Sequence, residues 1–138
     1  MELAVFKGRE AKLNRAILQS ISTNGSQTIY ELYKNVRTLS GLKTTHYANV
    51  NKRVRSLEQI GYLKKLKTQS TKAGFKTIIY ELTNRAYLAL VLNAINIDDL
   101  LNTLNEEFAL QITAIIAEAT SKTQSSTKRK QKSTNSSK

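Results

Sequence analysis

Residues 44–63 read TTHYANVNKRVRSLEQIGYL, and this stretch has the pattern of a single amphipathic helix with a defined end. Val50, Val54 and Leu57 recur at helical spacing, which predicts one face turned toward a hydrophobic core. Gly61 follows at the position where many helices end in a left-handed conformation, which glycine adopts without steric cost. We therefore expect a helix that is buried along one side and stops at Gly61.

The polar face of this predicted helix is strongly basic. Lys52, Arg53 and Arg55 lie there with a single acid, Glu58. Residues 43–76 as a whole hold nine Lys and Arg against one Glu, a local charge of +8. A solvated face is one interpretation, and a surface that meets a polyanion is the other. Charge of this density favours a nucleic acid or an anionic membrane surface as the partner.

Charge is distributed unevenly over the rest of the chain, whose net charge is +12. Residues 93–120 contain five acids and no base, whereas residues 121–138 contain six bases and no acid. The absence of cysteine excludes disulfides and thiolate metal sites. No apolar run approaches the ~18 residues that a membrane span needs, and the N-terminus lacks the pattern of a secretory signal. We therefore expect an intracellular, cytoplasmic protein.

Local signals before residue 44 predict two more helices. Leu13, Ile17 and Ile21 at four-residue spacing, with Ala16 beside them, predict a first helix over about Arg9 to Ile21. Thr28 and Glu31 match a capping box, in which each side chain accepts a hydrogen bond from the other residue's amide. They predict the start of a second helix that runs to about Leu39. Thr44 is the predicted N-cap of the third helix.

After Gly61 the pattern changes from helix to strand. Leu63–Thr68 and Thr77–Leu82 are short, partly alternating runs rich in strand formers, and the polar stretch between them contains Gly74. They predict a β-hairpin with a longish loop. Thr83 is a candidate cap for a fourth helix over about Asn84–Leu92.

The last third of the chain contains two segments of different composition. Apolar residues recur at helical spacing from Ile97 to Thr120, which predicts one long helix of about six turns. Residues 121–138 are almost entirely Ser, Thr, Lys, Gln and Asn. Because these side chains leave nothing apolar to bury, we expect this segment to be disordered.

Two segments carry a family resemblance: VNKRVRSLEQIGYLKKLK (residues 50–67) and, after a polar loop, IIYELTNRAYLAL (residues 78–90). Their order resembles the winged-helix DNA-binding family, in which a recognition helix with a Leu-Glu-x-x-Gly-Tyr/Leu ending leads into a β-hairpin wing. The returning strand of that family closes with Tyr-x-Leu-Thr, matched here by Tyr80, Leu82 and Thr83. Ala86 departs from the family, which often has glycine at that position.

The resemblance covers about residues 9–92, and it implies a mainly α fold with a small β-hairpin wing. The expected architecture is a winged helix-turn-helix followed by a long C-terminal helix and a disordered basic tail. Residues 1–92 would form the DNA-binding domain, residues 93–120 a dimerisation helix, and residues 121–138 the tail. The partner implied is double-stranded DNA, with the third helix lying in its major groove.

The exposed side of the third helix suits a major groove. Ala48 permits close approach, and Asn49 offers the donor and acceptor pair that matches adenine. Lys52 and Arg55 can contact bases or phosphates, and hydroxyls at the helix start can contact phosphates. The hairpin lysines can contact the DNA backbone, or they can protect exposed strand edges from aggregation. The predicted DNA-binding residues are Thr44, Thr45, Ala48, Asn49, Lys52, Arg53, Arg55, Lys72 and Lys76.

Phe75 stands between the two lysines that flank the hairpin loop. It is either tucked under the hairpin or an apolar probe of a DNA groove, and we expect it to be tucked. The tail's KRKQK (residues 128–132) fits a nonspecific phosphate-binding arm, a localisation signal or a solubilising segment.

The long predicted helix has an apolar stripe that a small winged domain cannot cover completely. Packing back on the first helix is one alternative. Self-association is the interpretation we favour, because DNA-binding dimers of this kind read two half-sites. The predicted dimerisation residues are Leu101, Leu104, Phe108, Ile112, Ile115 and Ile116.

Nothing in the sequence indicates an enzyme or a cofactor. His46 is the single histidine, and one imidazole without cysteine or a nearby carboxylate pair builds neither a metal site nor a catalytic triad. We expect a homodimeric, nucleoid-associated transcription regulator without a small-molecule ligand. The alternatives are an architectural protein that coats DNA nonspecifically and, from another class, a winged-helix protein-interaction module.

Overall fold

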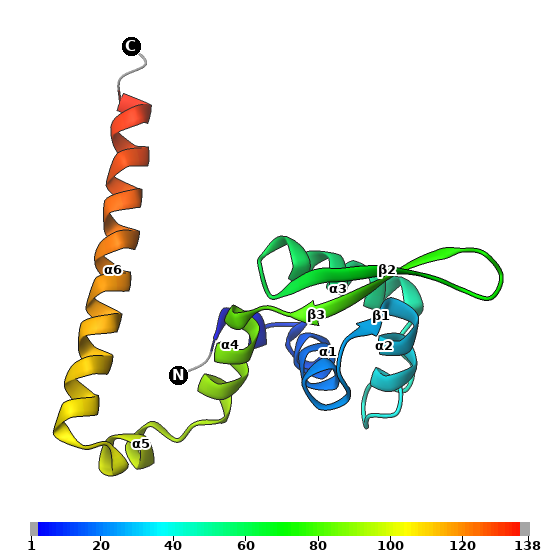
Figure 1. The fold of residues 1–138 in the computed structure, drawn as a ribbon, viewed down its shortest axis with the longest axis horizontal. Coiled ribbons are helices and arrows are strands. Elements are labelled where there is room, and N and C mark those ends of the chain that lie inside the picture. The colour runs from blue at the N-terminus through cyan, green and yellow to red at the C-terminus, as the bar shows by residue number, and fades with distance from the viewer. Residues whose placement is uncertain (1–2, 136–138) are drawn as a thin grey trace. The chain divides into compact units, whose positions relative to one another are not determined.

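The computed structural model describes the backbone of residues 3–135 and the side chains of residues 3–122. The chain divides into two compact units, residues 1–94 and residues 95–138. The first unit contains η1 (Ala4–Phe6), α1 (Ala11–Asn24), β1 (Gln27–Thr28), α2 (Ile29–Val36), α3 (Tyr47–Gln59), β2 (Leu63–Ser70), β3 (Lys76–Leu82) and α4 (Asn84–Ala94) (Figure 1). The second contains α5 (Ile97–Thr103) and α6 (Glu106–Asn135).

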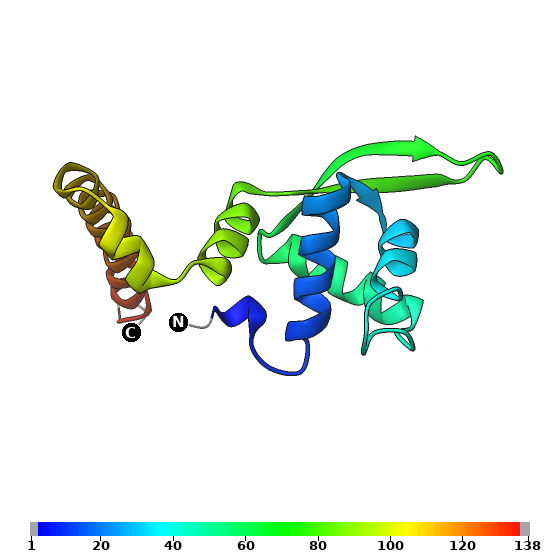
Figure 2. The same cartoon turned by 90° about the horizontal axis from the view of Figure 1, so that it is seen from below.

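The described residues are mainly helical with one small antiparallel sheet, as predicted. The sheet has the order β1-β3-β2. Its hairpin pairs Leu63 with Leu82 at the base and Ser70 with Lys76 near the loop. The short strand β1, which the sequence did not predict, adds Gln27 opposite Tyr80. Figure 2 shows β2 and β3 along one side of the first unit, with α1, α2 and α3 on the other side and the hairpin loop reaching beyond α2.

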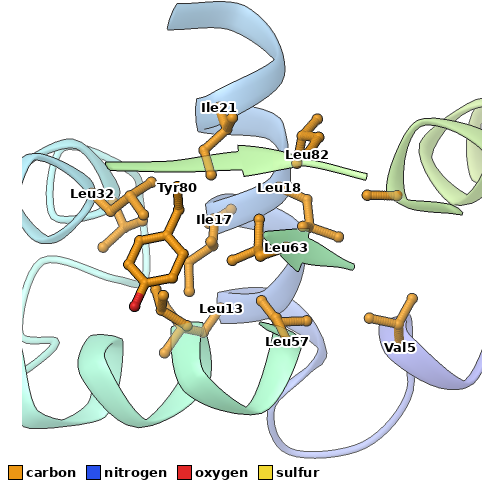
Figure 3. Close-up of a cluster of buried hydrophobic side chains, with 14 of the residues drawn as sticks. Val5, Leu13, Ile17, Leu18, Ile21, Leu32, Leu57, Leu63, Tyr80 and Leu82 are labelled. Atoms are coloured by element: carbon orange, nitrogen blue, oxygen red, sulfur yellow. The ribbon is translucent and has the colours of Figure 1, made fainter. Parts of the chain in front are cut away.

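The core lies between the sheet and these three helices. Ile17 and Leu18 of α1 are fully buried, and Figure 3 shows them among Leu32 of α2, Leu57 of α3 and Leu63 of β2. The predicted inner stripe of the third helix is confirmed, because all three of its members are fully buried: Val50, Val54 and Leu57. The 3-10 turn η1, also not predicted, adds Val5 and Phe6 to the same cluster.

The end of α3 has the geometry that the sequence predicts. Gly61 has a φ of +89°, and its N–H donates to the Glu58 carbonyl at 3.1 Å. The Tyr62 N–H donates to the Leu57 carbonyl at 2.8 Å, which completes a Schellman motif. Arg85 of α4 lies over this turn and donates to the Ile60 carbonyl at 2.8 Å.

Two predicted helix starts are confirmed by hydrogen bonds. At α2, the Glu31 N–H donates to Thr28 Oγ1 at 3.2 Å, and the Thr28 N–H donates to Glu31 Oε2 at 3.0 Å, which is a full capping box. At α4, the Ala86 N–H donates to Thr83 Oγ1 at 3.2 Å.

The predicted N-cap Thr44 is wrong. The N-cap residue of α3 is His46, and its side chain makes no capping hydrogen bond. Thr44 belongs instead to the turn that precedes α3, where buried Leu42 anchors the chain and accepts a hydrogen bond from the Thr45 N–H at 3.1 Å. A tertiary contact therefore sets the start of this helix and overrides the local capping preference.

The long helix predicted over Ile97–Thr120 is also wrong, because the structure divides it into α5 and α6. Asn105 interrupts it, since its Oδ1 accepts the Phe108 N–H at 2.9 Å and so begins a new helix. Glu106 and Glu107 in the first turn of α6 favour that start by their charge. At the end of α5, the Thr103 hydroxyl donates to the Asp99 and Leu100 carbonyls at 3.0 and 3.1 Å.

The predicted disordered tail, residues 121–138, differs from the structure, in which α6 continues to Asn135. No glycine or proline interrupts residues 106–135. A helix that has begun gains one backbone hydrogen bond for each residue added and does not incur the nucleation cost again. Residues 136–138 lie outside the described residues. Among the residues described, no helix combines the length and the apolar character of a membrane span.

We expect Gly61→Ala to lower the free energy of unfolding by about 1–2 kcal/mol, because a side chain at φ +89° is strained. A Cβ there would lie 2.8 Å from Arg85 Nη1, so the guanidinium must also move. Gly74→Ala is the matched control, with a φ of +84° and no atom within 4 Å of the added Cβ. Urea unfolding should rank Gly61→Ala as the more destabilised variant, and equal stability of the two would contradict the contact with Arg85.

Candidate nucleic-acid interface

The outer face of α3 presents the predicted groove-facing residues together. Ala48, Asn49, Lys52 and Arg55 are all exposed. Arg55 Nε donates to Asn51 Oδ1 at 3.2 Å, which orients the guanidinium along the helix surface. The buried stripe on the opposite side holds this face outward, so the exposure of these side chains follows from core packing.

Thr44 and Thr45 lie in the turn immediately before α3 and not in the helix itself. Thr44 is exposed and Thr45 is half-buried. Arg37 steadies the turn, because its Nε donates to the Lys43 carbonyl at 3.1 Å. Both residues therefore lie at the N-terminal end of α3.

Arg53 does not join Lys52 and Arg55 on the outer face. Its side chain is only 16% exposed and lies within 4.0 Å of Glu10. Its Nε donates to Oδ1 of the buried Asn14 at 3.0 Å, and Asn14 in turn donates from Nδ2 to the Val5 carbonyl at 2.9 Å. Arg53 thus ties α3 to α1 and to the N-terminal turn.

The hairpin loop carries the two remaining predicted residues, Lys72 in the loop and Lys76 at the start of β3, and both are exposed. Phe75 between them is 72% exposed, so the expectation that it is tucked under the hairpin is wrong. The physical reason is that the hairpin loop reaches past α2, so no helix lies beneath the end of the hairpin (Figure 2).

A cavity between α3 and the hairpin connects these two basic elements. Its lining residues are Arg55, Glu58, Gln59, Lys65, Ile78 and Tyr80. Burial raises the pKa of the Tyr80 phenol; the Glu58 carboxylate raises this pKa further, whereas Arg55 lowers it. The Tyr80 hydroxyl therefore stays protonated at neutral pH and can donate a hydrogen bond. The buried Glu58 Oε2 has no hydrogen-bond partner among the described residues.

A row of tyrosines near the start of α3 was missed by sequence reasoning. The ring centroids of Tyr30 and Tyr33 are 6.2 Å apart, and those of Tyr33 and Tyr47 are 5.6 Å apart in an edge-to-face arrangement. Lys34 lies over the Tyr30 ring and Arg37 over the Tyr33 ring, at 4.9 and 5.1 Å. The spacing of these residues along α2 could have indicated the row, because side chains three and four apart share a helix face.

In the second unit, the predicted dimerisation residues are not on one helix. Leu101 belongs to α5, and Leu104 lies in the break before α6. The other four share a stripe of α6 and are exposed: Phe108, Ile112, Ile115 and Ile116. Phe108 and Ile115 are 56% and 66% exposed, so α5 and the rest of α6 do not cover this stripe.

Within the described part of the chain, no group of three or more His, Asp or Glu residues is arranged to hold a metal ion. No family model matches the chain, and no curated protein matches it in sequence. Among solved structures it is similar to the crystal structure of a provisionally assigned transcriptional regulator from Thermoplasma acidophilum. That likeness has 22% sequence identity and a TM-score of 0.41, and it covers 64% of this chain and 89% of the other.

Replacing each of the two arginines of α3 by alanine should change the free energy of unfolding by different amounts. We expect Arg53→Ala to lower the free energy of unfolding by about 1–3 kcal/mol, because it leaves the side-chain Oδ1 of Asn14 buried without its donor. Arg55→Ala removes an exposed side chain and should stay within about 0.5 kcal/mol of the wild type. Urea unfolding measures both, and equal losses would contradict a structural role specific to Arg53.

Proposed function

We propose that this protein is a DNA-binding transcription regulator of the winged-helix type. Its third helix, α3, would lie in the major groove, and the β2–β3 hairpin would act as a wing on the DNA backbone. The observation that carries the proposal is the pairing of two exposed basic elements, the outer face of α3 and the end of the hairpin, in one compact unit. The inner stripe of α3 is buried, which leaves its polar side free for a ligand.

Double-stranded DNA fits this surface better than other polyanions. A major groove about 12 Å wide admits one α-helix, and α3 projects only one of its faces. The small side chain of Ala48 allows the helix backbone to approach the base edges. Asn49 beside it can donate to and accept from adenine, a pairing worth about 1–3 kcal/mol of discrimination.

The remaining predicted residues divide by position. Lys52 and Arg55 extend from the middle of α3 and can reach bases or phosphates. Thr44 and Thr45 at the start of the helix suit phosphate oxygens. Two further groups supply positive charge to the backbone: the wing residues Lys72 and Lys76, and the cations beside the tyrosine row, Lys34 and Arg37. We assign Arg53 to holding α3 in place rather than to contacting DNA.

We further propose that the protein works as a homodimer joined through α6. The stripe formed by Phe108, Ile112, Ile115 and Ile116 is exposed along one side of this helix. Burying a large apolar side chain stabilises an assembly by ~1.5–3 kcal/mol, and a second copy would cover all four. Two copies of α3 could then address half-sites about 34–36 Å apart, one turn of duplex.

An architectural protein that coats DNA without sequence preference is the second candidate. The observation that favours it is the number of lysines on the hairpin, since contacts to phosphates carry no sequence information. A winged-helix module for protein interaction would not need a charge of +8 over residues 43–76. The two DNA-binding candidates differ in how Asn49 contributes, which a mutant pair can resolve.

Gel-shift titrations of the full chain on genomic fragments, at several salt concentrations, test the proposed function. The logarithm of affinity should fall with the logarithm of salt by about 0.9 for each phosphate contacted. Lys72→Ala should weaken binding to all sequences and lower that slope by about one contact. Asn49→Ala should reduce the preference for specific fragments over random competitor. Binding that does not change with salt would contradict phosphate contacts, and equal losses on both DNA types in both variants would favour the architectural role.

The dimer proposal predicts that Phe108→Asp gives a monomer in which residues 1–94 remain folded. A charge at this position opposes burial in the interface, and DNA binding should weaken because one copy addresses one half-site. Leu110→Asp is the matched control: Leu110 is 71% exposed and lies about 200° around α6 from Phe108. Sedimentation should find wild type and Leu110→Asp dimeric, and a dimeric Phe108→Asp protein would disprove this interface.

A further inference from the structure

We propose that Phe75 is a wedge that inserts between two base pairs in the minor groove and bends the DNA. This inference rests on the proposed function and adds a distortion of the duplex that a backbone-contacting wing does not require. It assigns different roles to neighbouring side chains of one loop, since Lys72 and Lys76 would hold phosphates while Phe75 unstacks bases.

The first observation is the exposure of the ring. At 72%, Phe75 is the most exposed large apolar side chain among the described residues. It stands at the end of the hairpin, where the chain reaches beyond α2 (Figure 1). A side chain placed there contributes little to the core, so its apolar surface is available to a partner.

The second observation is that the loop holds this position by backbone hydrogen bonds. The Thr71 N–H donates to the Phe75 carbonyl at 2.8 Å, and the Gly74 N–H donates to the Thr71 carbonyl at 3.0 Å. The Phe75 N–H donates to Thr71 Oγ1 at 3.1 Å. Gly74 has a φ of +84°, which suits glycine at this turn. The ring is thus presented by an ordered turn, which lowers the entropy lost when it binds.

Charge identifies the partner. The hairpin carries the lysines Lys64, Lys65, Lys67, Lys72 and Lys76. Its acid, Glu81, lies near the base and pairs with Lys64 at 3.4 Å. The outer half is therefore purely cationic around one aromatic ring. One ring is too small a surface for a protein partner, because specific interfaces bury about 800 Å² on each side. An aromatic ring surrounded by phosphate-binding lysines matches the wedges that minor-groove proteins insert.

The hairpin is long enough to reach a second groove. Lys65 pairs with Tyr80 at the level of the cavity beside α3. From Lys65 to the loop at Thr71 the strand advances about 20 Å at ~3.3 Å per residue. That exceeds the ~12 Å width of the major groove that α3 would occupy. The register shift between Lys65 and Lys67 adds a bulge, which bends and twists the outer half of the hairpin relative to its base.

Phe75→Trp gives a direct test, because the chain contains no tryptophan. The variant would be titrated with a duplex that the wild type binds, and its emission and acrylamide quenching recorded. Stacking between bases should quench the emission several-fold and shield the indole from acrylamide. Leu66→Trp is the matched control: Leu66 lies on the same hairpin at the bulge and is 46% exposed. Its emission should change little.

Bending is measured separately with end-labelled duplexes by energy transfer. Phe75→Ala should abolish most of the bend while keeping the salt dependence of binding, since both loop lysines remain. Lys72→Ala should do the reverse, with a smaller salt dependence and the bend retained. An unbent wild-type complex, or indole emission from the Phe75→Trp variant that does not change on a bound duplex, would overturn the wedge and leave the proposed function standing.

Two further outcomes also decide the matter. If the wild-type chain binds no duplex at all, the proposed function and the wedge fail together. If Phe75→Trp responds to vesicles of anionic phospholipid and not to bound DNA, the ring belongs to a membrane contact and the wedge is overturned. Because the side chain is exposed and the turn is held by its backbone and Thr71, neither substitution should disturb folding, and far-UV circular dichroism checks this.

Discussion

The turn at Gly61 is the constraint on which the first unit depends. Here the chain leaves α3, reverses and enters the hairpin. Thr83 directly follows β3 at the base of the hairpin. Its hydroxyl donates to the Gly61 carbonyl at 2.6 Å, and its N–H donates to the Tyr62 carbonyl at 3.2 Å. Arg85 adds its bond to Ile60. One cluster of hydrogen bonds thus joins the end of α3, the base of both strands and the start of α4, so the helix and hairpin are held in one relative position.

Core packing then decides which charges face outward. The buried stripe of α3 turns Lys52 and Arg55 to the exterior, while Arg53, their neighbour in sequence, reaches back to Asn14 on α1. Two arginines of equal charge therefore have different environments. One supports the position of the helix, and the other is available to a polyanion. The cationic hairpin extends the same surface, with Phe75 at its end as an apolar exception.

The second unit differs from the first in having no hydrophobic core among its described residues. Its apolar side chains are not buried, and α5 contains no buried residue at all. Hydrophobic side chains recur at helical spacing along α6 and are exposed within this unit, an arrangement typical of a helix face that packs against another surface. The break at Asn105 confines that stripe to α6 and separates it from Leu101 and Leu104.

The sequence by itself determined the features that depend on neighbours along the chain. The capping box at Thr28, the buried stripe of α3, the stop at Gly61 and the hairpin were all predicted, because each rests on side chains within a few residues of one another. Tertiary structure decided the rest. Arg53 meets Asn14 39 residues away, and β1 exists because Gln27 and Thr28 find the edge of β3. Phe75 is exposed because the hairpin outreaches the helices beneath it. No local pattern encodes these distances, since they depend on how the completed core places segments that are remote in the chain.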